Sequence, residues 1–411
     1  MSTLNRLSVT QNNQNIQKRK ILFPDNSVDA FGRLAVASPV SIFDSKLTTN
    51  EQSRYWTDTL TSNGTATYDN NLSAMKLDVT TVSGDKVTRS TNECFNYQAG
   101  KGQGVFITFV MATPQTNLVQ RVGQFNVNDG LFFEYKDDTL YAVKRSSTSG
   151  SPVDTKIEQS QWNYDKMDGT GVSGVTIDVT KTNIAVIQYQ WLGVGAVTFA
   201  WDIDGVLFPC HVIKNANYET NVYIRTPNNP VTYEIENTGT TAGASQMRAI
   251  CCNVFSSGGS EPRTRTRGFD MGGDVLSVGS ASFIPVLSIR KNTASINETA
   301  RLLSYYLVVA TNDDIIYRIV LNPTLTTPDW AATVMDGGDG YIEADTAATS
   351  TTGGELLLTS GGSQNQSAPT SLAEGVKILT SGSTSDIISI QAISTATNAN
   401  VAAGINWEEI L

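Results

Sequence analysis

Residues 185–208, AVIQYQWLGVGAVTFAWDIDGVLF, contain the pattern that decides the fold. In 185–191 and again in 197–203, apolar and polar residues alternate, which places the apolar side chains on one face of an extended chain. Asp204-Gly205 then supplies residues that a two-residue hairpin turn prefers. The stretch therefore predicts half-buried strands joined by a tight turn.

The same period of two recurs along most of the chain. Residues 131–143 predict a second hairpin around the polar turn 136–139, and 231–236 predict another alternating strand. Charged residues make up only 17% of the chain, and Gly, Thr, Ser and Asn are abundant, a balance that favours short strands and turns. We therefore predict an all-β protein whose main domain is an antiparallel, jelly-roll-like β-sandwich.

With 411 residues the chain is long for one domain. The strand pattern stops at a Ser- and Gly-rich stretch near residue 257 and resumes more sparsely later, which indicates a smaller second β domain. The sequence predicts an N-terminal docking arm (1–20), a β-sandwich domain (21–257), a linker (258–270) and a C-terminal β domain (271–411).

Two basic stretches are candidates for docking. The arm ends in Lys18, Arg19 and Lys20, and it has too few apolar residues to offset the entropy of ordering, so we expect it to order only on a partner. Residues 263–267 read RTRTR. This run is typical of a solvated linker; if it is extended, Arg263, Arg265 and Arg267 project to one side and can grip an acidic neighbour or a phosphate.

The composition argues against several function classes. A net charge of -10 disfavours wrapping nucleic acid, and no apolar run is long enough to insert in a membrane. The four cysteines, Cys94, Cys210, Cys251 and Cys252, lack the spacing of a zinc site or a disulfide framework and are interpreted as buried free thiols. We expect no metal and no cofactor.

Catalytic patterns are sparse. His211 is the single histidine, and its neighbour Cys210 points to the opposite face of an extended strand, so the two cannot act together. Asp202 and Asp204 share one face, a spacing that suits a glycosidase pair or a cation, although aspartates are also ordinary on the polar face of a hairpin. Trp162, Tyr164 and Tyr218 lie in loop-like surroundings, where they either contact a glycan or pack in the core.

Residues 29–46, DAFGRLAVASPVSIFDSK, carry a resemblance to a known family. This segment resembles one that recurs in structural proteins of tailed bacteriophages, including marine and cyanobacterial phages, and phrases such as TPNNP at 226–230 extend the resemblance over about residues 20–257. Relatives often carry an arginine where this chain has Ala35. Separately, residues 201–206, WDIDGV, are similar to the strand and turn of concanavalin-like lectin sandwiches.

The resemblance implies a non-enzymatic virion structural protein, made in the host cytoplasm and used as a tail-fibre, baseplate or head-decoration subunit. Its expected partners are other virion proteins and copies of itself, as a homo-oligomer such as a trimer. The expected docking residues in its N-terminal segment are Phe31, Arg33 and Phe43. The alternatives are a lectin-like module that binds a host surface glycan and a polysaccharide depolymerase.

Overall fold

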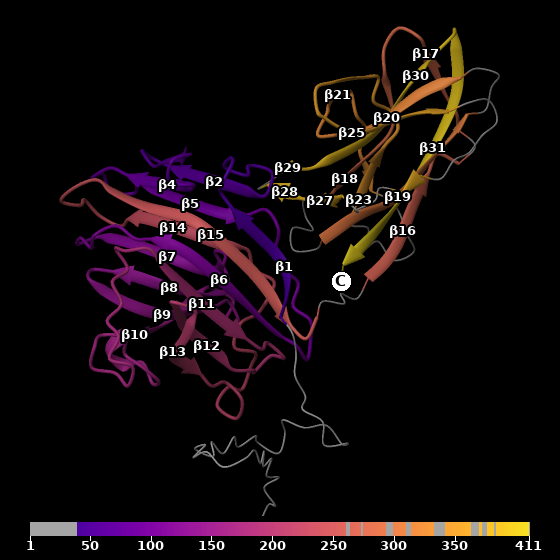
Figure 1. Ribbon diagram of the computed structural model, residues 1–411. Coiled ribbons are helices and arrows are strands. Elements are labelled where there is room, and N and C mark those ends of the chain that lie inside the picture. The colour runs from indigo at the N-terminus through magenta and orange to yellow at the C-terminus, as the bar shows by residue number, and fades with distance from the viewer. Residues whose placement is uncertain are drawn as a thin grey trace, which may run out of the picture.

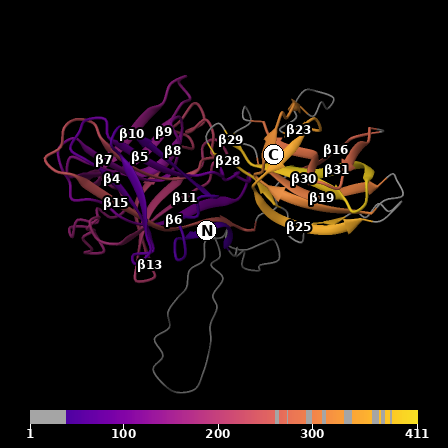
Figure 2. The ribbon, with the colours of Figure 1, turned by 90° about the horizontal axis from the view of Figure 1, so that it is seen from above.

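The computed structural model describes residues 39–259, 264–272, 274–292, 299–309, 314–332, 342–362, 370–371, 376–381 and 384–410. These residues form antiparallel β-sheets and one short 3-10 helix, η2 (Gln159–Gln161). The predicted all-β, sandwich fold class is confirmed. Figure 1 shows the strands in two bodies, one indigo to red and the other orange to yellow, and Figure 2 shows the same two bodies side by side from above.

The first body is a sandwich of two large sheets. One sheet has the order β13 (Val206–Ile213), β12 (Val197–Ile203), β11 (Asn183–Tyr189), β6 (Gly102–Val110), β15 (Ser245–Ser257), β4 (Ala74–Val79) and β3 (Thr65–Asp69), with β1 (Pro39–Lys46) also paired to β15. The other has the order β10 (Val153–Glu158), β9 (Thr139–Ser146), β8 (Gly130–Lys136), β7 (Leu118–Phe125), β14 (Val231–Asn237), β5 (Lys86–Thr91) and β2 (Trp56–Thr61).

The second body also has two main sheets. One has the order β16 (Thr264–Asp270), β31 (Asn398–Ile410), β19 (Thr299–Val309) and β26 (Thr370–Ser371), with β17 (Leu276–Gly279) on β31 and β27 (Lys377–Ile378) on β19. The other has the order β22 (Ala331–Ala332), β23 (Ile342–Asp345), β18 (Ile284–Lys291), β30 (Ile387–Ser394), β20 (Ile315–Leu321) and β25 (Glu355–Gly362). Two small ribbons complete it: β21 (Thr324–Thr326) with β24 (Ser350–Thr352), and β28 (Thr380–Ser381) with β29 (Thr384–Ser385).

Both predicted hairpins are present. Asp204 and Gly205 have φ of 53° and 77°, the left-handed conformation that a two-residue turn between twisted strands requires. Asp137 and Asp138 adopt the same conformation between β8 and β9. This second turn is shorter than the predicted 136–139, because Lys136 and Thr139 already pair across the ladder.

Each body has its own hydrophobic core. In the first, Phe133 on β8 packs against Trp201 on β12 with ring centroids 4.6 Å apart, and Phe199 adds an edge-to-face contact. These buried rings join the two sheets. In the second, the buried Ile390 and Trp407 belong to opposite sheets and to one cluster. Burial of the apolar face of each sheet is the main driving force for the folding of both sandwiches.

The structure corrects the predicted linker 258–270. Residues 264–270 form β16, which pairs with β31 over the whole of its length. The Thr-Arg run is therefore part of a strand, in which Thr264, Arg265 and Thr266 are exposed and Arg267 is half-buried. The predicted arm, residues 1–20, lies outside the described residues. No helix that could cross a membrane occurs in the part of the chain that the structure describes.

Asp85 ties together two turns of the first sandwich. Its buried carboxylate accepts hydrogen bonds from the backbone N–H of Asn63 and of Thr80, each at 3.0 Å. Burial alone would raise the pKa of Asp85, but the hydrogen bonds from Thr80 and Asn63 outweigh it and lower the pKa to about 2.

Asp85 should therefore contribute acid-sensitive stability. Because its folded pKa is depressed, this contribution is complete above the ordinary value of 3.8 and is lost as the pH falls toward about 2. We expect Asp85→Asn to be less stable than the parent at neutral pH and to lose less stability across that window. Urea unfolding at several pH values measures both curves, and parallel curves would contradict the assignment.

Candidate functional site

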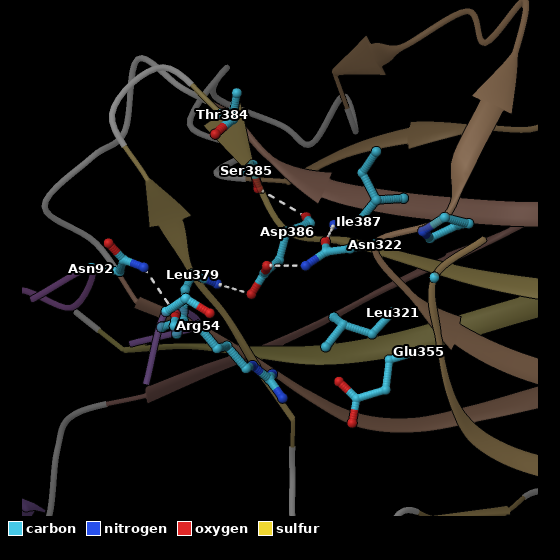
Figure 3. Close-up of a pocket in the computed structure, with 13 residues that line it drawn as sticks. Arg54, Asn92, Leu321, Asn322, Glu355, Leu379, Thr384, Ser385, Asp386 and Ile387 are labelled. Carbon is cyan, nitrogen blue, oxygen red and sulfur yellow. Dashed lines mark hydrogen bonds between the residues drawn. The ribbon is translucent and has the colours of Figure 1, made fainter. Parts of the chain in front are cut away.

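A cavity of about 550 Å³ lies between the two bodies, which are called the first and second domains below (Figure 3). Its volume is in the range of small-molecule sites. The first domain contributes Ser53, Arg54 and Asn92 to its lining, and the second contributes Leu321, Asn322, Pro323, Gly354, Glu355, Leu379, Thr384, Ser385, Asp386 and Ile387.

The first-domain wall is the loop before β2, and Asn92 holds it in place. The Asn92 side-chain amide donates to the carbonyl of Arg54 at 2.9 Å, and the Asn92 backbone N–H donates to the carbonyl of Tyr55 at 2.9 Å. Tyr55 in turn closes a tight turn on Gln52, at 2.9 Å. Arg54 therefore projects from a backbone that is hydrogen-bonded on both sides.

The second-domain wall centres on Asp386 and Asn322. The Asn322 amide donates to Asp386 Oδ1 at 2.7 Å, and the backbone N–H of Leu379 donates to Asp386 Oδ2 at 3.1 Å (Figure 3). Asn322 Oδ1 accepts from the N–H of Ile387 at 2.8 Å. Both oxygens of the aspartate are thus occupied, and this wall is fixed before any ligand arrives.

An ion pair and a hydrogen bond, both made by Lys377, join the domains beside the cavity. Lys377 Nζ contacts the two carboxylate oxygens of Glu93 at 2.6 and 2.8 Å, and the Lys377 carbonyl accepts from Arg54 Nη2 at 3.4 Å. Arg54 Nε is buried without a hydrogen-bond partner in the described structure. Glu355, which is exposed, forms no ion pair with any described residue. The cavity therefore offers one cation and one carboxylate that form no ion pair with a described residue.

A second charged cluster lies on the face of the seven-stranded sheet turned away from the core. The register places Arg121 between Glu234 and Glu134. Arg121 Nε donates to Glu134 at 2.7 Å, and Nη1 donates to Glu234. Lys86 lies 2.8 Å from Glu234, and Lys156 contacts Glu134. These side chains neutralise one another across neighbouring strands.

This cluster is poorly suited to acid–base catalysis. Burial alone would raise the pKa of Glu234, but the charges of Arg121 and Lys86 outweigh it and hold the pKa below its ordinary value. A glycosidase acid needs a carboxyl whose pKa is raised. The Glu234 carboxylate stays ionised at neutral pH and forms ion pairs with Arg121 and Lys86.

The candidate docking residues are placed as follows. Phe43 on β1 packs against Phe95 and Trp56, with ring centroids 5.2 and 6.4 Å apart, so its ring fixes β1 on the sandwich. Arg265 is exposed, whereas Arg267 Nε donates to the Glu409 carboxylate at 2.9 Å. The acidic partner of Arg267 therefore lies in the same chain. Six others lie outside the described residues: Lys18, Arg19, Lys20, Phe31, Arg33 and Arg263.

The candidate glycan contacts divide into two kinds. Trp162 is only 4% exposed and packs edge-on against Phe133, which corrects its assignment as a glycan contact. Tyr164 and Tyr218 are 56% and 78% exposed. The backbone N–H of Tyr164 donates to the carbonyl of Cys210, and the backbone N–H of Tyr218 donates to the carbonyl of Asn215. The two tyrosine rings are not in contact with each other in the described structure.

The remaining candidate residues have structural partners. His211 Nδ1 accepts from the N–H of Asn163 at 3.3 Å, and burial lowers the pKa of His211. Cys210 Sγ donates to the carbonyl of Phe199 at 3.3 Å, and burial raises the pKa of its thiol. Asp202 Oδ1 accepts from the N–H of Gly205 at 3.0 Å, so it stabilises its hairpin turn. No group of three or more His, Cys, Asp or Glu side chains is placed to hold a metal within the described ranges.

Sequence reasoning missed the cavity. Arg54 contacts the carbonyl of Lys377, 323 residues later, and no local pattern links such distant positions. The dipeptide Asn322-Pro323 marks the end of a strand, which is the one local signal near this wall.

Neither a family model nor a curated protein matches the chain. Several solved structures resemble about half of the chain. The legume lectin-like domain of Entamoeba histolytica shares 8% identity over 52% of this chain and 97% of its own, with a TM-score of 0.33. The Emp47p carbohydrate recognition domain shares 13% over 55% and 98%, with a TM-score of 0.33. A β-1,3-glucanase of Mycobacterium marinum shares 11% over 52% and 98%, with a TM-score of 0.33. Likenesses this distant carry no argument about function.

Proposed function

We propose that this chain is a non-enzymatic structural protein of a tailed-phage particle, used as a tail-fibre, baseplate or head-decoration subunit. The segment 29–46, with its resemblance to phage structural proteins, is the starting point. Its role would be to assemble with other virion proteins and with copies of itself, and to present a surface.

The observation that carries the proposal is how the end of this segment joins the fold. Residues 39–46 form β1, which pairs with β15 from Pro39 opposite Ser257 to Lys46 opposite Cys251. β1 is thus part of the sandwich. Its first residue, Pro39, which follows residues 1–38, pairs with Ser257, the last residue of β15, after which the chain continues to the second domain. A basic segment attached there suits contact with a neighbouring subunit.

The paired charges of the first domain support a non-enzymatic role. Arg121 pairs with Glu134 and Glu234 on this sheet face, so these acids are already engaged within the sheet. Such a network stabilises and orders a sheet, which is the requirement of a building block used in many copies.

The test is incorporation into particles. A tagged full-length chain and a variant lacking residues 1–20 would be supplied during infection by the encoding phage, and purified virions would be assayed by immunoblot. We expect the full chain in virions and the truncated chain only in the lysate, although both melt at the same temperature. Lys214→Ala, which removes an exposed cation of the first domain outside the docking candidates, serves as a control that keeps the arm and should be incorporated normally.

Two results would contradict parts of this proposal. If the full-length chain is absent from purified virions, the structural role is wrong. If the truncated chain enters virions at normal occupancy, docking belongs to residues 25–46, which include the docking candidates Phe31, Arg33 and Phe43, and not to the arm.

A further inference from the structure

The cavity between the domains has the charges and the walls of a ligand site. We propose that it binds an acidic saccharide, a sugar that carries a carboxylate, and that Arg54 holds this carboxylate. The inference concerns a different part of the molecule from the docking arm, and it stands whether or not the chain belongs to a virion.

Arg54 has hydrogen-bonding capacity to spare. Its one described side-chain hydrogen bond is the 3.4 Å contact from Nη2 to the Lys377 carbonyl, and its buried Nε has no partner among the described residues. A guanidinium carries five N–H donors in a planar fork that matches the two oxygens of a carboxylate. Because Nε is buried, a ligand carboxylate at the cavity wall would be held by the terminal nitrogens, of which Nη1 makes no hydrogen bond to a described residue.

The two carboxylates of the lining disfavour a doubly charged anion more than a singly charged one. Lys377 is already paired with Glu93, so among the described residues that line the cavity Arg54 is the cation left for a ligand. Asp386 and Glu355 line the same cavity with two carboxylates. A doubly charged phosphate would meet both of them with a single compensating cation, whereas a carboxylate needs only one. A metal ion would need more carboxylates together, and the described residues provide no such group.

The rest of the lining suits a body rich in hydroxyls. Ser53 and the exposed Glu355 can exchange hydrogen bonds with hydroxyl groups, and Glu355 accepts only, as an ionised carboxylate does. Leu321, Leu379 and Ile387 offer an aliphatic surface for the C–H face of a sugar ring. Hydroxyls beside a carboxylate on one small ring describe a uronic-acid type of sugar.

The cavity walls are ordered in advance. Asn92 holds the Arg54 carbonyl, and Asn322 holds Asp386, so neither wall must reorganise on binding (Figure 3). Preorganisation of this kind reduces the entropy lost on binding.

The experiment compares matched ligands and matched variants by titration calorimetry. The probes are methyl galacturonoside, which carries a single carboxylate, its methyl ester, which is neutral, and inorganic phosphate. We expect the full chain to bind methyl galacturonoside, and to bind the ester and phosphate at least about tenfold more weakly, because a hydrogen-bonded ion pair is lost. Arg54→Ala should weaken binding of methyl galacturonoside by about tenfold or more, Arg54→Lys by less, and Arg265→Ala should leave it unchanged.

Each outcome decides the inference. The absence of binding to the full chain, equal binding of the neutral ester, tighter binding of phosphate, or unchanged affinity in Arg54→Ala would each overturn it. Thermal unfolding of every variant shows whether the fold is intact. Virion incorporation is scored separately, so failure here leaves the structural role untouched, and the reverse also holds.

Discussion

Arg121→Ala is expected to lower the free energy of unfolding of the first domain by about 3–5 kcal/mol, the usual effect of removing one partner of a buried ion pair. The Arg121 side chain is 12% exposed, and the carboxylates of Glu134 and Glu234 that it joins are 0% and 7% exposed. Without the guanidinium, two nearly buried glutamates face each other across one strand. Among the described residues, Lys86 and Lys156 remain to pair with these two carboxylates.

The loss should depend on pH. In the parent the pKa of Glu234 is depressed, so its contribution is present above the ordinary value and is lost as the pH falls through the folded value. In Arg121→Ala the neighbouring carboxylates favour protonation instead, so acid should relieve part of the defect. The difference between parent and variant should therefore be larger at pH 7 than at about pH 4.

Urea unfolding followed by tryptophan fluorescence measures this difference. Lys46→Ala is the matched control, because Lys46 is 72% exposed and 4.0 Å from an exposed Asp44, and removal of such a pair costs about 0–1 kcal/mol. A defect in Arg121→Ala no larger than that of Lys46→Ala would show that the network contributes little. A defect of equal size at both pH values would show that it is not electrostatic.

The parts of the fold that sequence predicts are those with a local cause. Alternation from Val197 to Ile203 fixes which side chains face the core, and Asp204-Gly205 fixes the turn, because both act within a few residues. The pairing of β1 with β15 has no such cause, since Phe43 meets Val254 through burial of its ring and not through any local pattern. Long-range pairing depends on packing that one sequence does not display.

The site was harder to predict for the same reason. Trp162 lies in a polar stretch and was expected to be a loop residue, yet it is buried because η2 and the following loop fold over Phe133. Arg54 looks like an ordinary surface arginine, and its role arises only where Leu379 and Asp386 of the second domain approach it. The cavity forms where the two domains meet, and local sequence patterns do not indicate how two domains are arranged.

The Thr-Arg run shows how the same pattern supports two interpretations. Alternating small polar and charged residues near Ser and Gly are typical of a linker, and no apolar residue in 263–267 indicates a core face. What makes the run a strand is the pairing of Arg267 with Glu409, 142 residues later. The aliphatic part of an arginine can cover a sheet when its head group has an acidic partner.

Arg267→Ala should therefore destabilise the second domain by about 3–5 kcal/mol. Glu409 is fully buried, and its carboxylate accepts from Arg267 Nε at 2.9 Å and from Trp407 Nε1 at 3.1 Å. Loss of the guanidinium leaves a buried negative charge with the indole as its one described side-chain donor. The weakened segment is β31, the strand that pairs with both β16 and β19, so the whole sheet should lose cooperativity.

Arg265→Ala is the matched control, because it removes the same side chain two positions earlier on the same strand, where the arginine is exposed, and its effect should stay within about 0.5 kcal/mol. Adding Glu409→Gln to Arg267→Ala removes the uncompensated charge and should recover part of the loss, which a double-mutant cycle measures. Thermal unfolding of the full chain reports both variants. If Arg267→Ala is no less stable than Arg265→Ala, the ion pair is dispensable and Arg267 remains a candidate docking residue. If Arg267→Ala is much less stable, Arg267 stabilises the sheet to which it belongs. Arg265 is then the described arginine of this run that stays exposed and can contact another molecule.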